Sequence, residues 1–550
     1  MKSAGIRGIL EVQATQNLPE DPAMAKISGP SLVRNEETDG TAPSLDELRQ
    51  RLRAAARAAE SEAEALCSQE TISFREAERA LREVVFALGR ALVVLFLALR
   101  EARLDTRRAP GRVHWFGKVY RPAPPIGRQL TTMFGTVRYW RTYMRQVAKG
   151  KRCGFHPLDM DLGLSADRLS WNVLSRVVRL ATELSFARAR AVMSDFVPNT
   201  PSTEVIQQAL LGFGAHAEAF FEQQPAPEDD GEVLVVQFDG KGVPTATKRE
   251  LRRRRRKRRK RSKSGSPRHR GRDKRARHPS LPRRKKGDKS KNAKMATMVV
   301  MYTLRRKGTR RLEGPINRRH YVSFAPKRHA FIVARREADK RGFTQDAGRL
   351  VQVVTDGDND LADLTGEYFP EAEHTVDIFH VFEKLWEAGG AFLKEGSDAL
   401  RAWVDEQKQR LFDDDVEAVM GEMDRRLELI PKTGPGNKGR RERLAKATAY
   451  LRKRARKIRY GSLRRRDLVL ATGDVEGAIK HVLAKRCDQG GMRWTKERVQ
   501  AVAQLRCIDV NGDWEAFERF VHDRLSAAAR LNRGPERLQT KIPQPLPMAA

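Results

Sequence analysis

Apolar side chains recur at helical spacing through the first patterned part of the chain, from Ser44 to about Arg107, where the segment 107–111 (Arg-Arg-Ala-Pro-Gly) breaks the pattern. The most apolar stretch, Val84–Leu99, contains Arg90 and is shorter than the roughly 18 residues that a membrane-spanning helix needs. We therefore expect a buried core helix there and a soluble protein. Residues 1–44 mix Gly, Pro and acidic residues without periodicity, which predicts a disordered leader.

Two strand-like runs come next, Val113–Tyr120 and Leu130–Tyr143, and the second has apolar or aromatic side chains at alternate positions. The Pro-Ala-Pro-Pro segment at 122–125 separates them, which predicts a β-hairpin with a long loop. Three helical segments follow: Asp167–Leu184, Ala187–Phe196 and Pro201–Gln223. Thr200 and Pro201 suit the N-cap and the first turn of the third. Short helices with tight turns fit either a helix-turn-helix DNA reader or a plain helical bundle, and the pattern favours the bundle.

Beyond a linker at 225–231, the pattern changes to short, continuous apolar runs, which are typical of central strands covered on both faces. The predicted strands are Val233–Val236, Met298–Tyr302, Tyr321–Phe324, Leu350–Val354 and Glu373–Val376. A helical stretch, Ala330–Lys340, lies between the third and the fourth, and further helices fill the region from about Glu383 to Arg466. Strands and helices in this order predict a mixed α/β sheet.

Composition narrows the class of partner. The chain has 550 residues, 40% of them hydrophobic, which allows two to four domains and a sizeable core. Its net charge of +37 indicates a polyanionic partner, most commonly nucleic acid, although a basic surface that only aids solubility is the alternative. The four cysteines form no CxxC pair, which argues against a zinc ribbon and a disulfide framework and is typical of a reducing cytoplasm.

One segment holds most of this charge. Residues 248–291 contain 25 Lys or Arg against three acids, a net charge of +22. Self-repulsion and the Ser, Gly and Pro content predict disorder in the free protein, and we expect the segment to neutralise DNA phosphates. The cations with which it begins are Arg252, Arg253, Arg254, Arg255, Arg256, Lys257, Arg258, Arg259, Lys260 and Arg261.

Two carboxylates stand at the ends of predicted strands, Asp239 before Gly240 and Asp356 before Gly357. Acids at the carboxyl ends of neighbouring strands, each followed by a glycine that permits close approach, form a cradle for divalent cations. Phosphodiester chemistry uses such a pair with one further acid, and two metal ions activate the attacking group and stabilise the leaving oxygen. Asp-Gly after a strand is also a common turn signal, so one such pair alone is weak evidence for a metal site.

The third acid is less well defined by the pattern. Glu476 lies in the first turn of a predicted helix, where the helix dipole favours an acid in any case, and Asp474 is the next candidate. Asp377 and His380 are spaced to share a helix face, directly after a strand-like segment. Such a histidine is usually structural, but the pair could position active-site acids or contact DNA. Trp494 fits either packing or stacking on an unpaired base, with packing favoured.

These motifs together resemble the Mutator-like superfamily of DDE transposases, which have an RNase H-like fold. The segments that carry the likeness are Asp239-Gly, Asp356-Gly, Asp377–Trp386, Gly473–Arg486, Gly491–Trp494 and Gln504–Arg506. The last four are similar to bacterial insertion-sequence transposases of the Kra-four group. The likeness covers roughly residues 110–520 and departs from the family in the length of the basic segment at 248–291.

The resemblance implies a catalytic triad of Asp239, Asp356 and Glu476 that binds two Mg²⁺ or Mn²⁺ ions, with Asp377 and His380 as an accessory motif. It implies an α/β, RNase H-like catalytic core with an all-helical insertion, after a mainly helical region that contains a β-hairpin. The layout that we expect is a leader at 1–44, a DNA-binding region at 45–224, core at 231–382, a helical insertion at 383–466, core with Glu476 at 467–525, and a disordered tail at 526–550.

The sequence therefore predicts a transposase that cleaves transposon ends and joins them to target DNA in the bacterial cytoplasm, on the nucleoid. It predicts DNA as partner, a dimer or higher oligomer on DNA, and no membrane association. Arg493 and Trp494 are further candidate DNA contacts, and Arg486 either touches phosphate or is solvated. Two alternatives are a domesticated protein that binds nucleic acid without catalysis, and an RNase H-like nuclease that does not transfer strands.

Overall fold

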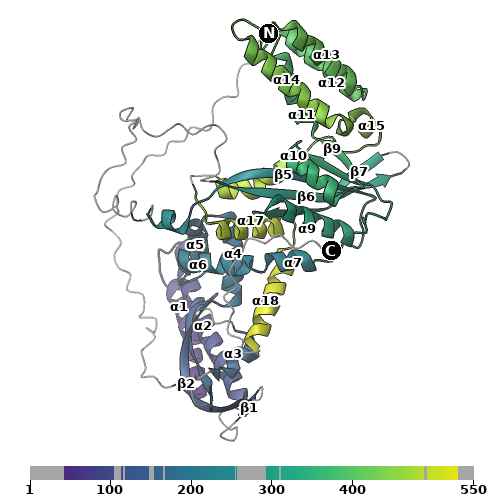
Figure 1. Ribbon diagram of the computed structural model, residues 1–550. Coiled ribbons are helices and arrows are strands. Elements are labelled where there is room, and N and C mark those ends of the chain that lie inside the picture. The colour runs from purple at the N-terminus through teal and green to yellow at the C-terminus, as the bar shows by residue number, and fades with distance from the viewer. Residues whose placement is uncertain are drawn as a thin grey trace.

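The computed structural model describes residues 42–104, 113–115, 118–147, 154–164, 168–253, 256, 293–308, 311–488 and 492–530. The molecule is elongated and has three parts (Figure 1). A helical hairpin and an antiparallel sheet form the bottom, a five-stranded sheet between helices forms the middle, and a bundle of helices stands at the top. The protein is mixed α/β, as the pattern predicted.

Two helices joined by a short turn begin the described chain, α1 (Leu45–Cys67) and α2 (Phe74–Arg103). Each starts with a capping box, in which a serine and a glutamate three residues later satisfy each other's backbone N–H groups. The pattern predicted helix here but missed the turn at 68–73, because the second capping box lies within a continuously helix-favouring sequence.

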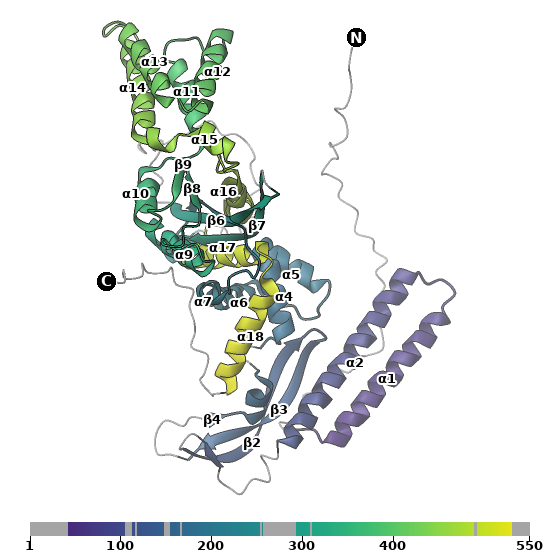
Figure 2. The same cartoon turned by 90° about the vertical axis from the view of Figure 1, so that its right-hand side faces the viewer.

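Helix α2 is buried on one face only. The expectation of a buried core helix at Val84–Leu99 is therefore wrong for the opposite face, which is exposed. Leu97 is 4% exposed and packs in a small core against the neighbouring sheet. Val85, Leu92 and Phe96 are 55%, 50% and 55% exposed. The reason is that α1 and strand β3 cover only part of the helix circumference (Figure 2).

The first sheet is antiparallel and has the order β1-β2-β3-β4. Its strands are β1 (Val113–Trp115), β2 (Lys118–Thr132), β3 (Gly135–Gln146) and β4 (Gly154–Phe155). The hairpin turn lies between Thr132 and Gly135, and β2 runs through the prolines at 122–125, where the register shifts. The predicted long loop is therefore wrong: a β-bulge accommodates prolines, which lack the N–H that regular pairing needs.

Short helices connect this sheet to the middle of the molecule. They are α3 (Pro157–Leu162), α4 (Trp171–Glu183), α5 (Phe186–Ser194), α6 (Thr203–Gly214) and α7 (Ala217–Gln223). The third predicted segment is thus two helices, and the N-cap of α6 is Ser202 rather than Thr200, whose hydroxyl donates to the carbonyl of Val197. Helices α4 and α6 pack on each other and on α17 (Lys496–Val510), as expected of a bundle.

The central sheet has the order β7-β6-β5-β8-β9. Its strands are β5 (Val233–Pro244), β6 (Ala293–Lys307), β7 (Arg311–Ser323), β8 (Val351–Thr355) and β9 (Glu373–Val376). Strands β5, β6 and β7 pair antiparallel, whereas β8 pairs parallel to β5 and β9 parallel to β8. All five predicted strands are confirmed, and β6 and β7 extend well beyond the apolar runs that predicted them.

Alternate residues of these strands enter two separate cores, as the pleat requires. Leu234, Val236 and Phe238 of β5 pack against α9 (Lys327–Lys340) and α10 (Asn359–Tyr368). Residues in between, such as Val235, pack on the opposite face, where α17 (Lys496–Val510) and the helices before β5 lie. Burial on both faces explains why these strands read as continuous apolar runs.

A helical insertion separates β9 from the rest of the middle part, and it stands at the top of Figure 1. It consists of α11 (Ile378–Gly389), α12 (Asp398–Phe412), α13 (Val416–Leu429), α14 (Asn437–Arg454), the short 3-10 helix η1 (Ala455–Lys457) and α15 (Tyr460–Arg465). The chain then returns to the sheet as α16 (Gly473–Ala478) and η2, a π-helix at Ile479–Asp488.

Helix α18 (Trp514–Arg530) ends the described part of the chain, so the predicted disordered tail is wrong for residues 526–530. The start of the basic segment, residues 248–253, is also helical rather than disordered, because Thr247 and Glu250 form a capping box. The predictions for residues 1–41, 257–291 and 531–550 lie outside the described residues. No described helix has the length and apolarity needed to cross a membrane.

The half-exposed helix α2 generates the first prediction. Leu97→Ala lowers the free energy of unfolding by about 2–5 kcal/mol because it opens a cavity in the small core. Leu92→Ala changes it by less than about 0.5 kcal/mol, since this side chain lies at the surface. Urea unfolding of both variants measures the difference, and a large loss for Leu92→Ala would mean that the exposed face is covered in the folded protein.

Candidate active site

Asp239 lies within β5 at the point where one side of that strand becomes open. The parallel pairing of β5 with β8 ends at Phe238 and Thr355, while β5 continues along β6 to Pro244. The expectation that Asp239 closes the strand is therefore wrong, because Gly240 extends the strand instead of turning it. The Asp239 carboxylate nevertheless stands at the carboxyl end of the parallel pair, as the strand-end argument required.

Asp356 follows the last residue of β8, as predicted. Its Oδ1 atom accepts the backbone N–H of Asp358 at 2.9 Å. Gly357 has φ +84°, a conformation that favours glycine, and a Cβ there would lie 2.2 Å from the Tyr450 hydroxyl oxygen. The glycine after Asp356 is thus required by its conformation and by a close approach of α14.

Two buried glutamines of the sheet hold the segment that carries Glu476. Gln237 of β5 accepts the backbone N–H of Val475 at 3.0 Å. Gln352 of β8 accepts the N–H of Val469 at 3.0 Å and donates to its carbonyl at 2.6 Å. Both glutamine side chains are fully buried. These contacts attach the start of α16, and with it Glu476, to the central sheet.

The sequence interpretation missed both glutamines, although a signal was present. Each stands in the middle of an apolar strand, Val-Val-Gln237-Phe and Val-Gln352-Val-Val. A polar side chain that points into a core needs partners there, so its position marks a segment of the chain that must return to the sheet.

Asp377 is the N-cap of α11 and is fully buried. Its Oδ2 atom accepts the N–H and hydroxyl of Thr472 at 2.5 and 2.6 Å, and its Oδ1 atom accepts from His380 N at 2.9 Å and lies 3.3 Å from His380 Nδ1. Burial raises the pKa of Asp377, but the hydrogen bonds from His380 and Thr472 outweigh it and lower this pKa to about 2. Four accepted bonds use the capacity of the carboxylate.

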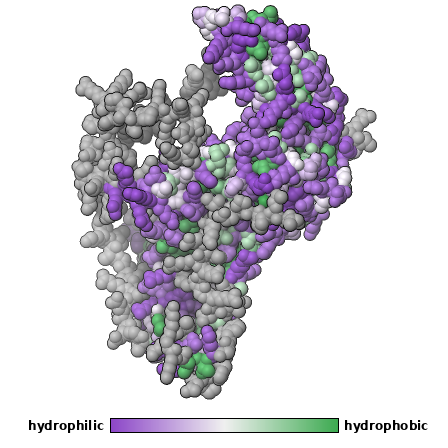
Figure 3. Space-filling model, viewed as in Figure 1, coloured by the Kyte–Doolittle hydropathy of each residue, from purple (hydrophilic) through white to green (hydrophobic). Residues whose placement is uncertain are grey.

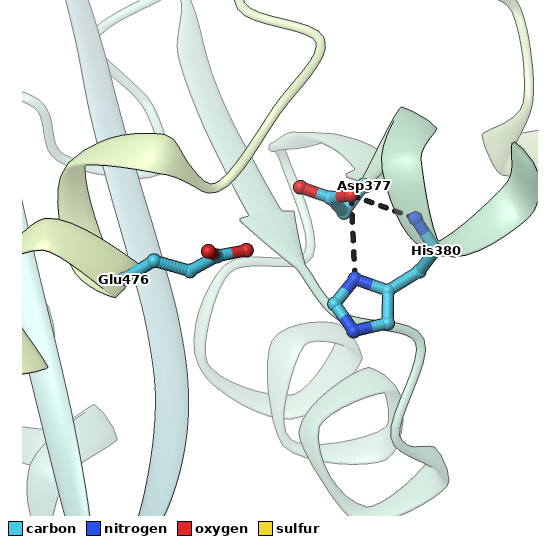
Figure 4. A group of neighbouring side chains, drawn as sticks. All are labelled: Asp377, His380 and Glu476. Atoms are coloured by element: carbon cyan, nitrogen blue, oxygen red, sulfur yellow. Dashed lines mark hydrogen bonds and ion pairs between the residues drawn. The ribbon is translucent and has the colours of Figure 1, made fainter. Parts of the chain in front are cut away.

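His380 is a cation at neutral pH. Its hydrogen bond to Asp377 raises the pKa of the imidazole to about 9, against the effect of burial and with help from the charges of Asp356 and Glu383. Since the folded pKa is the higher one, the pair stabilises the fold below pH 6.5, and this contribution is lost as the pH rises through about 9. Figure 4 shows Glu476 pointing from its own helix toward the Asp377–His380 pair.

The five predicted residues thus lie around one region, but they are not equivalent as metal ligands. Ligand atoms of Asp377, His380 and Glu476 lie within 4.8 Å of one another. Asp377 already accepts four hydrogen bonds, two from His380 and two from Thr472. Among the described residues, Asp239 and Asp356 are not part of that close group, although the charges of Asp356 and Glu476 both act on Asp239. Carboxylate oxygens of this kind are the ligands that suit Mg²⁺ or Mn²⁺.

The electrostatics of Asp239 fit a cation site. Burial, together with the charges of Asp356 and Glu476, raises its pKa to about 6, although a hydrogen bond from Gly240 and the charge of His380 act in the opposite direction. A carboxylate that is disfavoured in its charged form by burial and by neighbouring acids gains most from a bound cation. Asp474, the alternative third acid, is instead paired with Arg318 at 2.6 Å.

The predicted DNA contacts divide into three groups. Arg252, Arg253, Arg256 and Arg493 are exposed, and the other predicted cations of the basic segment lie outside the described residues. Trp494 is 5% exposed and donates to the Cys487 carbonyl at 3.0 Å, so the packing alternative holds and no ring face is free for a base. Arg486 is 2% exposed and donates to the Ala181 carbonyl, so it is neither solvated nor available to phosphate.

We expect Asp239→Asn to raise the free energy of unfolding at pH 7.5 without divalent cations, by about 1–3 kcal/mol. The folded protein binds the Asp239 proton more tightly than the unfolded chain does, so wild-type stability falls as the pH rises from 3.8 to about 6, and the variant avoids this loss. Thermal and urea unfolding between pH 4 and 7.5 measure the difference. Mg²⁺ should stabilise the wild type alone; equal stability under all conditions would contradict the site.

Replacing Gln237, which holds the segment with Glu476, gives a second test. Gln237→Leu leaves the Val475 N–H without a partner and should lower the free energy of unfolding by about 1–3 kcal/mol. Gln407 of α12 is an apt control, because it is also fully buried but neither of its polar side-chain atoms has a described partner. Gln407→Leu should be neutral or stabilising. Similar losses in the two variants would mean that the Gln237 contacts do not hold the Glu476 segment.

No protein-family model matches the chain, and a search of curated proteins finds none with a similar sequence. The assignment of this site therefore depends on its geometry and on the motifs of the chain itself.

Proposed function

We propose that this protein is a DDE-type DNA transposase, which cleaves DNA at transposon ends and transfers those ends to target DNA. The supporting observation is that the charges of Asp356 and Glu476, from two distant segments, both act on Asp239, while Glu476 lies beside the Asp377–His380 pair. Burial and mutual repulsion there raise the pKa of Asp239 to about 6. A cluster of carboxylates of this kind is the donor set of metal-dependent phosphodiester chemistry.

The order of the central strands supports an RNase H-like core. Strands β5, β6 and β7 form an antiparallel meander, and β8 and β9 add in parallel on the other side of β5. Asp239 lies on β5, the first strand of this core, and Asp356 follows β8, the fourth strand. The helical insertion separates them from the third acid, in the order that the family resemblance implies.

The site divides its tasks among its residues. Two Mg²⁺ or Mn²⁺ ions held by the three acids would activate the attacking water or 3′-hydroxyl and stabilise the leaving oxygen. Asp377 orients the segment before Glu476 through Thr472, and it fixes His380 as a cation beside the acids. That positive charge favours a phosphate in a region that three carboxylates would otherwise make repulsive.

DNA is the polyanion that this chemistry requires, and the net charge of +37 suits it. Pairing two transposon ends needs at least two active sites, so the proposal includes a dimer or higher oligomer on DNA. No covalent bond between protein and DNA is required, because water and a DNA hydroxyl serve as the nucleophiles.

Substitution of each acid tests the proposal. Asp239→Asn, Asp356→Asn and Glu476→Gln should each reduce Mg²⁺-dependent cleavage of a transposon-end duplex by at least about 10³-fold, because each removes a ligand. DNA affinity measured in EDTA should stay within about twofold of wild type. Asp346→Asn, an exposed aspartate away from the site, is the control. Cleavage that survives in Asp239→Asn and Asp356→Asn would refute the assignment.

Joining of products separates the proposal from its two alternatives. A transposase transfers the cleaved 3′-end to a target plasmid, whereas a nuclease on the same fold leaves only cleaved ends. A domesticated DNA-binding protein binds the same duplex and does neither.

A further inference from the structure

Helix α14 is the most basic helix of the insertion. Its 18 residues contain eight Lys or Arg and a single acid, Glu442. Helix α12 has equal numbers of acids and bases, and α13 has more acids. The surface of this part of the molecule is largely hydrophilic (Figure 3). The positive charge of the insertion is therefore concentrated on α14 and on the residues that follow it to Arg466.

Three exposed cations of α14 form a stripe. Arg443, Lys446 and Lys453 are exposed and, with Tyr450 between them, follow one another at intervals of three or four residues, which places them on one face. None of the three forms an ion pair with a described residue. We call these three cations the basic stripe. Arg452, by contrast, lies off this face and pairs with Asp424 at 2.6 Å.

Helix stability does not account for the stripe. Arg443 and Lys446 lie one turn apart and repel each other, whereas Glu442, four residues before Lys446, is the acid of this helix that acts against the repulsion. A cation in the last turn is favoured by the helix dipole, which explains Lys453 but not the two in the middle of the helix. A polyanion bound along this face would relieve the repulsion.

The helix that carries the stripe contacts the loop that contains Asp356. The hydroxyl of Tyr450 donates to the Asp356 carbonyl at 3.2 Å, and Arg454 donates through Nε to the Gly357 carbonyl at 2.9 Å. The Arg454 guanidinium lies 3.9 Å from the centre of the Tyr450 ring. Helix α14 is thereby fixed to the Asp356 loop, and Gly357 lacks the Cβ that would prevent this contact.

The dimensions of the stripe fit a DNA backbone. At about 1.5 Å per residue, Arg443 and Lys453 are roughly 15 Å apart along the helix axis. One DNA strand advances about 3.4 Å along its axis per phosphate, so the stripe is long enough to contact more than one phosphate. A small anion would occupy one cation and leave the others unneutralised.

We propose that Arg443, Lys446 and Lys453 form a phosphate-binding track that guides duplex DNA into the active site. The identity of the bound DNA as substrate rests on the proposed function. Tyr450 and Arg454 act as positioning residues that couple the track to Asp356. The helical insertion then binds substrate, in addition to separating the last acid from the first two.

The test compares two triple variants of the full-length protein with equal loss of charge. Arg443→Gln, Lys446→Gln and Lys453→Gln remove the stripe; Arg401→Gln, Arg425→Gln and Lys432→Gln remove three exposed cations elsewhere on the insertion. Duplex binding is measured in EDTA over a range of salt concentrations. The stripe variant should bind about tenfold or more weakly, and its slope of log affinity against log salt should fall by roughly 2–3. The control should keep the wild-type slope.

A third variant guards against loss of structure. Lys446→Arg with Lys453→Arg keeps the charge and should bind like wild type, and all variants are checked by thermal unfolding. Equal slopes for the stripe and control variants would overturn the track, even if wild-type protein cleaves DNA. If instead the slope depends on the stripe while wild-type protein shows no Mg²⁺-dependent cleavage, the track stands and the transposase proposal fails.

Discussion

The contact on which the candidate site depends is the attachment of a late segment of the chain to the central sheet by buried polar side chains. Gln237, Gln352 and Asp377 together bind backbone or side-chain groups of residues 469–475. Buried amide and carboxylate groups destabilise the fold when they lack hydrogen-bond partners. These side chains therefore have all of their partners only when this segment is in place. The same bonds bring Glu476 toward Asp239 and Asp356.

The clustered acids destabilise the fold, and other contacts in the site reduce this effect. Asp239 is half-buried, and burial and the charges of Asp356 and Glu476 raise its pKa, so the folded state disfavours its charged form. Asp377 avoids this cost because four hydrogen bonds stabilise its charged form. Asp377 therefore supports the structure, whereas Asp239, Asp356 and Glu476 remain available to bind a cation. His380 joins the two groups, since it pairs with Asp377 and faces Asp356.

Much of the central fold could be predicted from the sequence, because its strands are continuous apolar runs and its helices have caps and apolar stripes. The errors arose where one signal has two structural meanings. The prolines at 122–125 indicated a loop but occupy a bulge, and Asp239-Gly240 indicated a strand end but continues the strand. The apolar face of α2 indicated burial, yet periodicity does not tell which neighbours are present to cover it. Proximity of Glu476 to the other acids could not be predicted from pattern alone, because it depends on long-range bonds from Gln237 and Gln352.

The central claim is that Asp239, Asp356 and Glu476 share one metal site. Replacing Mg²⁺ with Fe²⁺ and adding ascorbate and peroxide generates radicals that cut the backbone next to the bound ion, and mass spectrometry locates the cuts. We predict cuts near all three acids, suppressed together by excess Mg²⁺ and absent in Asp239→Asn. Cuts near only one of the three acids, or cuts that Mg²⁺ does not suppress, would contradict it.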